Sequence, residues 1–196
     1  MVLAQAELRS SVVAKEIRFE PPLEENQWGQ ASVDLRLGFS FTKIKQDIRS
    51  VKVSISDGLG ELGEMGFWNT IILKERDDLG KIQTFSLEPG EFVLAMTYER
   101  VTIPSNLVAI VEGRSTYARA GISMHQTAPW IQRGWSGQIV LEMVNQGPLT
   151  IELTPIKDRP CQLSFFQLTS TLPDDLLYGS RPTDSYQSQT HPLKRR

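Results

Sequence analysis

A run of glycine, arginine and hydroxyl side chains follows an apolar stretch near the middle of the chain. It reads Gly113, Arg114, Ser115, Thr116. Glycine permits close backbone approach, arginine offers a planar fork of donors, and hydroxyls donate to phosphate oxygens. The run therefore indicates a phosphate cradle, although it would equally suit a solvated surface turn. It is not a Walker loop, because the G-x-x-x-x-G-K-[ST] pattern is absent.

A second chemical signal is a single carboxylate, Glu142, inside an apolar run. On a strand, Glu142 shares one face with Val140 and Val144, and the opposite face is apolar as well. A glutamate in such surroundings is either paired with a cation or held for proton chemistry. Arg119 is a candidate partner. The alternative is an edge-strand glutamate that points to water.

Trp135, between Gly134 and Gly137, is an aromatic candidate just before this strand. Its ring could stack on a sugar or base, or it could be a core tryptophan beside a turn. His125 stands in a short mixed segment that could be a strand. A lone histidine there is more typical of hydrogen-bonded structure than of catalysis.

Metal-ligand patterns are missing from the sequence. Zinc-dependent nucleobase deaminases need H-x-E and P-C-x-x-C, whereas this chain has one cysteine, Cys161, and two histidines. We therefore expect no zinc site. No G-x-S-x-G elbow or Cys-His pairing indicates covalent catalysis.

The composition bounds the class of protein. The chain has 196 residues and a net charge of −2, so no sequence-wide basic field favours a nucleic-acid polymer as partner. The single cysteine favours a reducing compartment. The first residues do not read as a signal peptide, and no apolar run has the length of a membrane span. We expect a cytoplasmic protein with no membrane partner.

The hydrophobic pattern predicts the elements that would position these residues. Helical spacing indicates one short helix over residues 3–16. Short strands are predicted at 32–38, 82–87, 91–96, 107–112, 138–144, 149–153 and 161–168. This rhythm predicts an all-β sandwich or barrel. Four glycines make residues 53–70 look like a long loop or insertion. Residues 1–172 would form one domain, and 173–196 a polar tail, either disordered or an active-site lid.

Several motifs together resemble one known family. The run from Glu112 to Gly121 closely resembles the EGRSSLARLG motif of dCTP deaminases. His125-x-Thr127-Ala128, residues 134–137 and the segment 139–145 follow in that family's order and spacing, and residues 31–38 and 89–95 match upstream. The resemblance extends from about residue 30 to 168. Trimeric dUTP diphosphatases share the fold, so the family is more firmly indicated than the reaction.

The resemblance implies a homotrimer of dUTPase-like, distorted β-barrel subunits of the jelly-roll or β-clip type, with active sites shared at subunit boundaries. It implies hydrolytic deamination of dCTP to dUTP and ammonia, with Mg²⁺ carried by the triphosphate, no zinc, and dTTP as a candidate inhibitor. One alternative is a bifunctional deaminase and dUTP diphosphatase, or a diphosphatase alone. Another is a nucleotide-binding homologue without turnover.

The resemblance also assigns residue roles. Glu142 would be the general acid/base, taking a proton from the water that attacks C4 of cytosine and passing it toward N3 and the leaving amine. Arg119 would orient Glu142 and the water, and Ser115 would fix that network. Arg114, Ser115 and Thr116 would hold phosphates, and Trp135 would pack against the deoxyribose. The other expected substrate-binding residues are Tyr117, Ala118, Ala128, Gln132, Val140, Leu141, Tyr178, Ser185 and Gln189.

Two positions depart from the family pattern. Where the family usually shows Ile-Asp-Pro-Gly, this chain has Ile131, Gln132, Arg133 and Gly134. An amide thus replaces the carboxylate acceptor, which counts against strong diphosphatase activity. In the tail, Ser185 stands where the family has a lysine that reaches the triphosphate, so we expect a weaker hold on that group.

Overall fold

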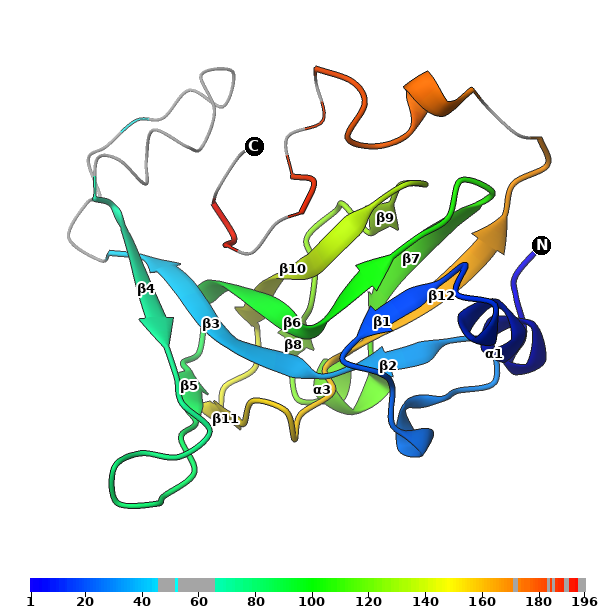
Figure 1. Ribbon diagram of the computed structural model, residues 1–196. Coiled ribbons are helices and arrows are strands. Elements are labelled where there is room, and N and C mark those ends of the chain that lie inside the picture. The colour runs from blue at the N-terminus through cyan, green and yellow to red at the C-terminus, as the bar shows by residue number, and fades with distance from the viewer. Residues whose placement is uncertain are drawn as a thin grey trace.

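The computed structural model describes residues 1–45, 52, 66–170, 173–182, 184, 186–188 and 191–193 (Figure 1). The helices are α1 (Gln5–Val13), α3 (Ser115–Arg119) and two 3-10 turns (Glu25–Gln27 and Asp174–Leu176). The strands are β1 (Arg18–Glu20), β2 (Val33–Leu35), β3 (Leu37–Ile44), β4 (Trp68–Ile72), β5 (Phe85–Leu87), β6 (Phe92–Thr102), β7 (Leu107–Gly113), β8 (Ile122–Ser123), β9 (Trp130–Ile131), β10 (Ser136–Asn145), β11 (Ile151–Leu153) and β12 (Cys161–Gln167). The predicted all-β fold with a short N-terminal helix is confirmed.

Antiparallel pairing arranges these strands in two main sheets and one small ladder. The larger sheet has the order β4-β3-β6-β10-β8, and β1 also pairs with β6. The second sheet has the order β2-β12-β7-β9, and β11 pairs with β5. Figure 1 shows the second sheet beside α1 and the end of β4 and β3 on the opposite side of the molecule. Among the described residues these sheets stay open and do not close into one barrel.

Alternating side chains along the strands build the core. On β10, the residues Ile139, Leu141 and Met143 are buried, whereas their neighbours in the chain are half-buried. Phe41 and Phe85 stack with their ring centroids 4.2 Å apart. Cys161, opposite Leu35 of β2 and Gly113 of β7, is fully buried, and burial raises the pKa of its thiol.

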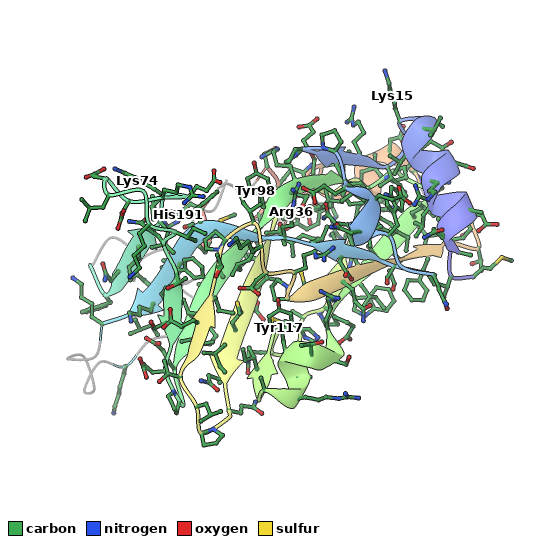
Figure 2. The ribbon with its side chains drawn as sticks, turned by 90° about the horizontal axis from the view of Figure 1, so that it is seen from below. Lys15, Arg36, Lys74, Tyr98, Tyr117 and His191 are labelled. Carbon is green, nitrogen blue, oxygen red and sulfur yellow. The ribbon has the colours of Figure 1, made fainter. Side chains whose placement is uncertain are left out.

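The predicted strand over 32–38 divides into β2 and β3 at Arg36. The backbone N–H of Arg36 donates to Glu99 Oε2 at 2.9 Å, and its Nε donates to Glu99 Oε1 at 2.6 Å. Gln27 Nε2 also donates to Glu99 Oε1, at 2.9 Å. The guanidinium of Arg36 lies 4.9 Å from the ring centre of Tyr98, and Figure 2 shows the two side by side. The strand is interrupted at Arg36 because its backbone N–H bonds to Glu99 instead of to a neighbouring strand. The buried carboxylate of Glu99 needs these donors.

Other predicted elements match in position, with some differences. The helix predicted over 3–16 is α1, of which only Leu8 is buried. The glycine-rich segment 53–70 lies mostly outside the described residues, but its end enters β4, a strand that the sequence pattern did not predict. The short strands β1, β8 and β9 and the helix α3 were also not predicted. No helix in the described ranges is long and apolar enough to cross a membrane.

Candidate functional site

Arg114 joins the end of β7 to the start of α3. It has extended backbone, and Ser115–Arg119 then form the short helix α3. Its Nη1 donates to the carbonyl of Arg159 at 2.9 Å, and its Nη2 lies 3.1 Å from Asp34 Oδ2. The predicted phosphate cradle is therefore the first turn of a helix, with its arginine oriented by two protein acceptors. Ser115 and Thr116 are exposed.

Asp34 is a partner that the sequence analysis did not single out, although it lies in the motif around residues 31–38. Burial raises the pKa of its carboxyl group, and the nearby charges of Arg114 and Arg159 oppose that shift. A partly buried carboxylate beside Arg114 fixes the direction of the guanidinium. The remaining N–H groups of Arg114 are then available to a ligand at a defined angle.

Tyr117 ties α3 to the segment that precedes β12. Its hydroxyl donates to Asp158 Oδ1 at 2.8 Å and accepts from the backbone N–H of Arg159 at 3.1 Å. The other oxygen of Asp158 accepts from the backbone N–H of Thr154 at 2.6 Å. Burial, together with the hydrogen bond to Asp158, raises the pKa of Tyr117. Figure 2 labels Tyr117 on α3. Tyr117 stays a predicted substrate-binding residue, and its hydroxyl is engaged with the protein itself.

Glu142 projects from the half-buried face of β10, together with Val140. Its Oε2 accepts from the backbone N–H of Gln126 at 3.0 Å, and the Gln126 side chain donates to the Glu142 carbonyl at 3.2 Å. The register across β6, β3 and β4 places Leu94, Thr42 and Thr70 in line with Glu142 on this face. The carboxylate thus stands next to the apolar side chain of Leu94, with one oxygen held in place.

The structure places other predicted site residues at different positions relative to Glu142. Ala128 is exposed, in the same loop as Gln126. The side chain of Leu141 is fully buried in the core, on the face opposite Glu142. Ala118 and Arg119 are exposed on α3. Within the part of the single chain that the structure describes, neither Arg119 nor Ser115 forms a hydrogen bond or ion pair with Glu142.

Trp135 is buried, and its ring packs against Tyr178 of the tail with centroids 5.3 Å apart. The predicted residues Trp135 and Tyr178 are therefore brought together. Gln132 is exposed, and its carbonyl accepts from the Trp135 backbone N–H at 3.1 Å, closing the turn between β9 and β10. Ser185 and Gln189 lie outside the described residues.

A cleft of about 300 Å³ opens beside α3 and β8. Its lining includes Glu112, Gly113, Ala118, Ser123 and His125. His125 Nε2 lies 3.2 Å from Glu112 Oε2, so the histidine has the hydrogen-bonded role that its sequence context indicated, although it follows β8 instead of lying in a strand. No three His, Cys, Asp or Glu side chains cluster as a metal site in the described ranges.

The α3 segment, the Glu142 strand and the turn between them can be compared with the motifs of known protein families. The dCTP deaminase-like family matches residues 2–168, which include α3, the Glu142 strand and the turn between them. The chain belongs to the dCTP deaminase-like family. The resemblance carried by residues 112–121 and 139–145 is therefore confirmed over nearly the whole predicted domain.

Curated relatives support the same membership. A dCTP deaminase of Rhodospirillum rubrum is 36% identical over 196 residues, which is 100% of this chain and 96% of that protein. A "dCTP deaminase, dUMP-forming" of Methanosphaera stadtmanae is 35% identical over 97% of this chain and 91% of that protein. The crystal structure of the dCTP deaminase from Agrobacterium tumefaciens shares the fold, with a TM-score of 0.62 and 21% identity over 84% of this chain and 48% of that one.

Proposed function

We propose that this chain is an enzyme that hydrolyses dCTP to dUTP and ammonia. The observation that carries the proposal is the placement of Glu142: a carboxylate on a half-buried strand face, with one oxygen fixed by the Gln126 N–H. It stands within the ordered motifs of a family whose full-length relatives are dCTP deaminases.

The chemistry follows from the two oxygens of Glu142. Because Oε2 accepts from the Gln126 N–H, and Oε1 has no hydrogen-bond partner among the described residues, Oε1 is the oxygen available to a water molecule. The carboxylate takes a proton as that water attacks C4 of cytosine. It passes this proton to N3, then takes the proton of the hydroxyl now on C4 and gives it to the leaving amine, so that the C4 carbonyl forms and the carboxylate is regenerated as ammonia departs. A positioned acid/base of this kind contributes about 10²–10⁴-fold to the rate.

The phosphates are assigned to the start of α3. Arg114 is already oriented by Asp34 and the Arg159 carbonyl, and the hydroxyls of Ser115 and Thr116 are exposed beside it. These donors suit the phosphate oxygens of a nucleotide that carries Mg²⁺, whose role is to neutralise part of the triphosphate charge. Arg119 is assigned to orient Glu142 and the attacking water, and Ser115 to fix that network.

Active sites shared within a homotrimer are part of the proposal. The single chain leaves Arg119 and Glu142 unconnected, yet both are accessible on its surface. A neighbouring subunit that presents its α3 to the Glu142 face would bring the two groups together. This arrangement supports a site completed by symmetry.

A second candidate is a bifunctional enzyme that releases dUMP. Relatives named dCTP deaminase and relatives named as dUMP-forming match the chain at nearly equal identity, 36% and 35%. Gln132, in place of the family aspartate, disfavours this second hydrolysis, since an amide is a poorer guide for a hydrolytic water than a carboxylate.

One assay tests both candidates. Purified protein is incubated with dCTP, dCMP, CTP or dUTP and Mg²⁺, and ammonia and nucleotide products are measured together. We expect ammonia and dUTP from dCTP, with activity reduced by removing Mg²⁺ and unchanged by a zinc-selective chelator. Formation of dUMP and pyrophosphate would support the bifunctional enzyme. Nucleotide binding without ammonia release would overturn the proposal in favour of a homologue that only binds, and dTTP added to the assay tests it as an inhibitor.

A further inference from the structure

The described part of the C-terminal segment, residues 173–182, 184 and 186–188, is attached to the turn between β9 and β10. In Figure 1 it runs, in orange and red, along the end of the molecule that carries β9 and β10. We call residues 132–136 the docking turn. The attachment uses hydrogen bonds spread over the segment, so it holds more than one point of the tail.

The main-chain part of this attachment is a pair of backbone hydrogen bonds. The N–H of Tyr178 donates to the carbonyl of Arg133 at 3.0 Å, and the N–H of Ser188 donates to the carbonyl of Ser136 at 2.8 Å. Gly134 permits the close approach, because a Cβ at that position would lie 3.1 Å from the Cβ of Leu177 and its φ is +79°. The tail backbone therefore lies directly against the docking turn.

Two side chains complete the attachment, one from each partner. Gln187 of the tail donates from Nε2 to the Gly134 carbonyl at 3.0 Å and accepts at Oε1 from the Ser136 N–H at 3.2 Å. From the docking turn, Arg133 Nη2 donates to the carbonyl of Pro173 at 3.0 Å. These contacts hold the tail at Pro173 and at Gln187.

Arg133 is unusual because its guanidinium is almost entirely removed from water. The residue is only 4% exposed. A buried cation is costly unless its donors are satisfied, so the protein acceptors determine where the guanidinium points. This is also the position where the family pattern has proline, which has no side-chain donor. The tail contact made by Arg133 is thus a property of this chain's own sequence.

We propose that Arg133 is a positioning residue that keeps the C-terminal segment docked against the docking turn. Docking holds Tyr178 against Trp135, whose ring centroids are 5.3 Å apart, and so preforms one wall next to the docking turn. The attachment itself follows from the contacts above. Its consequence for turnover rests on the proposed function and on the contact of Trp135 with the sugar that the family resemblance implies.

Hydrogen exchange in the nucleotide-free protein tests the attachment without any turnover. Arg133→Met keeps a long side chain and removes the donors, and Arg133→Lys keeps a cation. Arg76→Met is the matched control, because Arg76 donates to Gly80 in a distant exposed loop. We expect wild-type protection at the amides of Tyr178 and Ser188, a loss of about tenfold or more in Arg133→Met, an intermediate loss in Arg133→Lys, and none in the control.

Three outcomes would overturn the proposal. One is a wild-type tail that exchanges at unprotected rates, and a second is an Arg133→Met tail as protected as the wild type. The third is a loss of protection that spreads equally through β10 and β12, since Arg133 would then support the core and not the tail. If Arg133→Met does not fold, Arg133→Lys against wild type decides between the same outcomes.

Kinetics then separate the attachment from the proposed reaction. If the chain deaminates dCTP, we expect Arg133→Met to raise KM for dCTP by a larger factor than it lowers kcat, because each binding event must first dock the tail. A changed kcat with an unchanged KM would contradict the role in preparing the binding site. Absence of turnover in the wild type would defeat the proposed function but leave the exchange result standing.

Discussion

At the scale of single residues, the carboxylate of Glu142 is distinguished by an asymmetric environment. One oxygen is fixed by the Gln126 N–H, and the other has no hydrogen-bond partner in the part of the chain that the structure describes. An exposed glutamate would sample many rotamers, whereas this one is restricted by its strand and by a main-chain donor. Such preorganisation is what a proton-transferring group requires.

Glu142→Gln separates proton transfer from binding. The amide oxygen of glutamine can still accept from the Gln126 N–H, so the local structure and nucleotide affinity should be largely kept. The proton-accepting oxygen is lost, and we expect ammonia release to fall by at least about 10²–10⁴-fold. The measurements are steady-state kinetics with dCTP and calorimetric binding of dCTP.

The matched control is Glu152→Gln, the same chemical change at the exposed position of strand β11. Its carboxylate bonds to Thr84 and Ser86, outside the Glu142 face. We expect the control to retain wild-type turnover. If Glu142→Gln turned over dCTP within a few-fold of wild type, Glu142 would not be the acid/base.

Prediction from the sequence found site residues that stand out by their type. It missed residues that act through contacts with distant parts of the chain. Glu142, Arg114 and Trp135 stand out because their side chains are unusual in their local pattern. Asp34 and Gln126 do not, because their importance comes from partners far along the chain or from a backbone N–H. No periodicity in a single sequence encodes such pairings.

At the scale of elements, α3 depends on an anchor to stay in place. The helix has only five residues, too few to be stable by itself. The hydroxyl of Tyr117 bonds both to Asp158 and to the Arg159 N–H, and Arg159 also supplies the carbonyl that orients Arg114. The position of Arg114 and of the candidate phosphate site therefore depends on the hydrogen bonds of the Tyr117 hydroxyl.

Tyr117→Phe should loosen that coupling. It leaves an oxygen of Asp158 and the Arg159 N–H without their partner, and we expect the free energy of unfolding to fall by about 1–3 kcal/mol in urea denaturation. Tyr98→Phe is the control, because the Tyr98 hydroxyl has no hydrogen-bond partner among the described residues. Equal stability of the two variants would show that the phenol does not anchor α3.

Acid should release the loop at residues 179–184. Asp184 accepts from the Arg181 side chain and from the backbone N–H groups of Gly179 and Arg181. The Arg181 hydrogen bond is the main cause that holds the pKa of Asp184 below its ordinary value. A lowered pKa means that the contribution of Asp184 is complete above about pH 4, the value for an unfolded aspartate, and is lost as the pH falls through the folded pKa.

Asp184→Asn measures this contribution directly. At pH 7 we expect faster hydrogen exchange in the loop 179–184 of the variant than in the wild type. The two proteins should converge as the pH falls below about 4, because the wild-type carboxyl then becomes neutral as well. A difference that persisted at low pH would assign the effect to geometry and not to charge.

At the scale of the whole molecule, the proposed trimer makes a prediction about mixed subunits. If Arg119 of one subunit serves Glu142 of another, Arg119→Ala and Glu142→Gln chains are inactive separately but regain activity when reassembled together. Each mixed trimer then contains a site with both native residues. Light scattering establishes the mass, and ammonia release reports the complementation.

Two results of the mixing experiment would contradict active sites shared between subunits. A monomer in light scattering would contradict shared sites altogether. A stable trimer without recovery would place the complete site within one chain, so that Arg119 would have to reach the Glu142 of its own subunit. A mixture of Glu142→Gln with Glu152→Gln chains supplies the control, because here intact sites already exist.

The overall fold was more predictable than its details. The seven-residue strands β7 and β12 were predicted closely, whereas the eight-residue strand β3 was predicted only at its first two residues, within the range 32–38. The strands β8 and β9 have two residues each, so no period exists to detect, and they form because longer neighbours offer a ladder edge. The break at Arg36 required knowledge of Glu99, more than sixty positions later in the chain.

Because Cys161 is buried, the rate at which a reagent labels its thiol reports how often the protein unfolds. Cys161 is the only cysteine of the chain, and its thiol is enclosed between β2 and β7 with a raised pKa, so a thiol-specific reagent finds neither access nor thiolate in the folded state. Labelling therefore proceeds only when these strands separate. Movements confined to the tail or to α3 leave the labelling rate unchanged, and the lifetime of the native sheet can be timed on the natural sequence without an added probe.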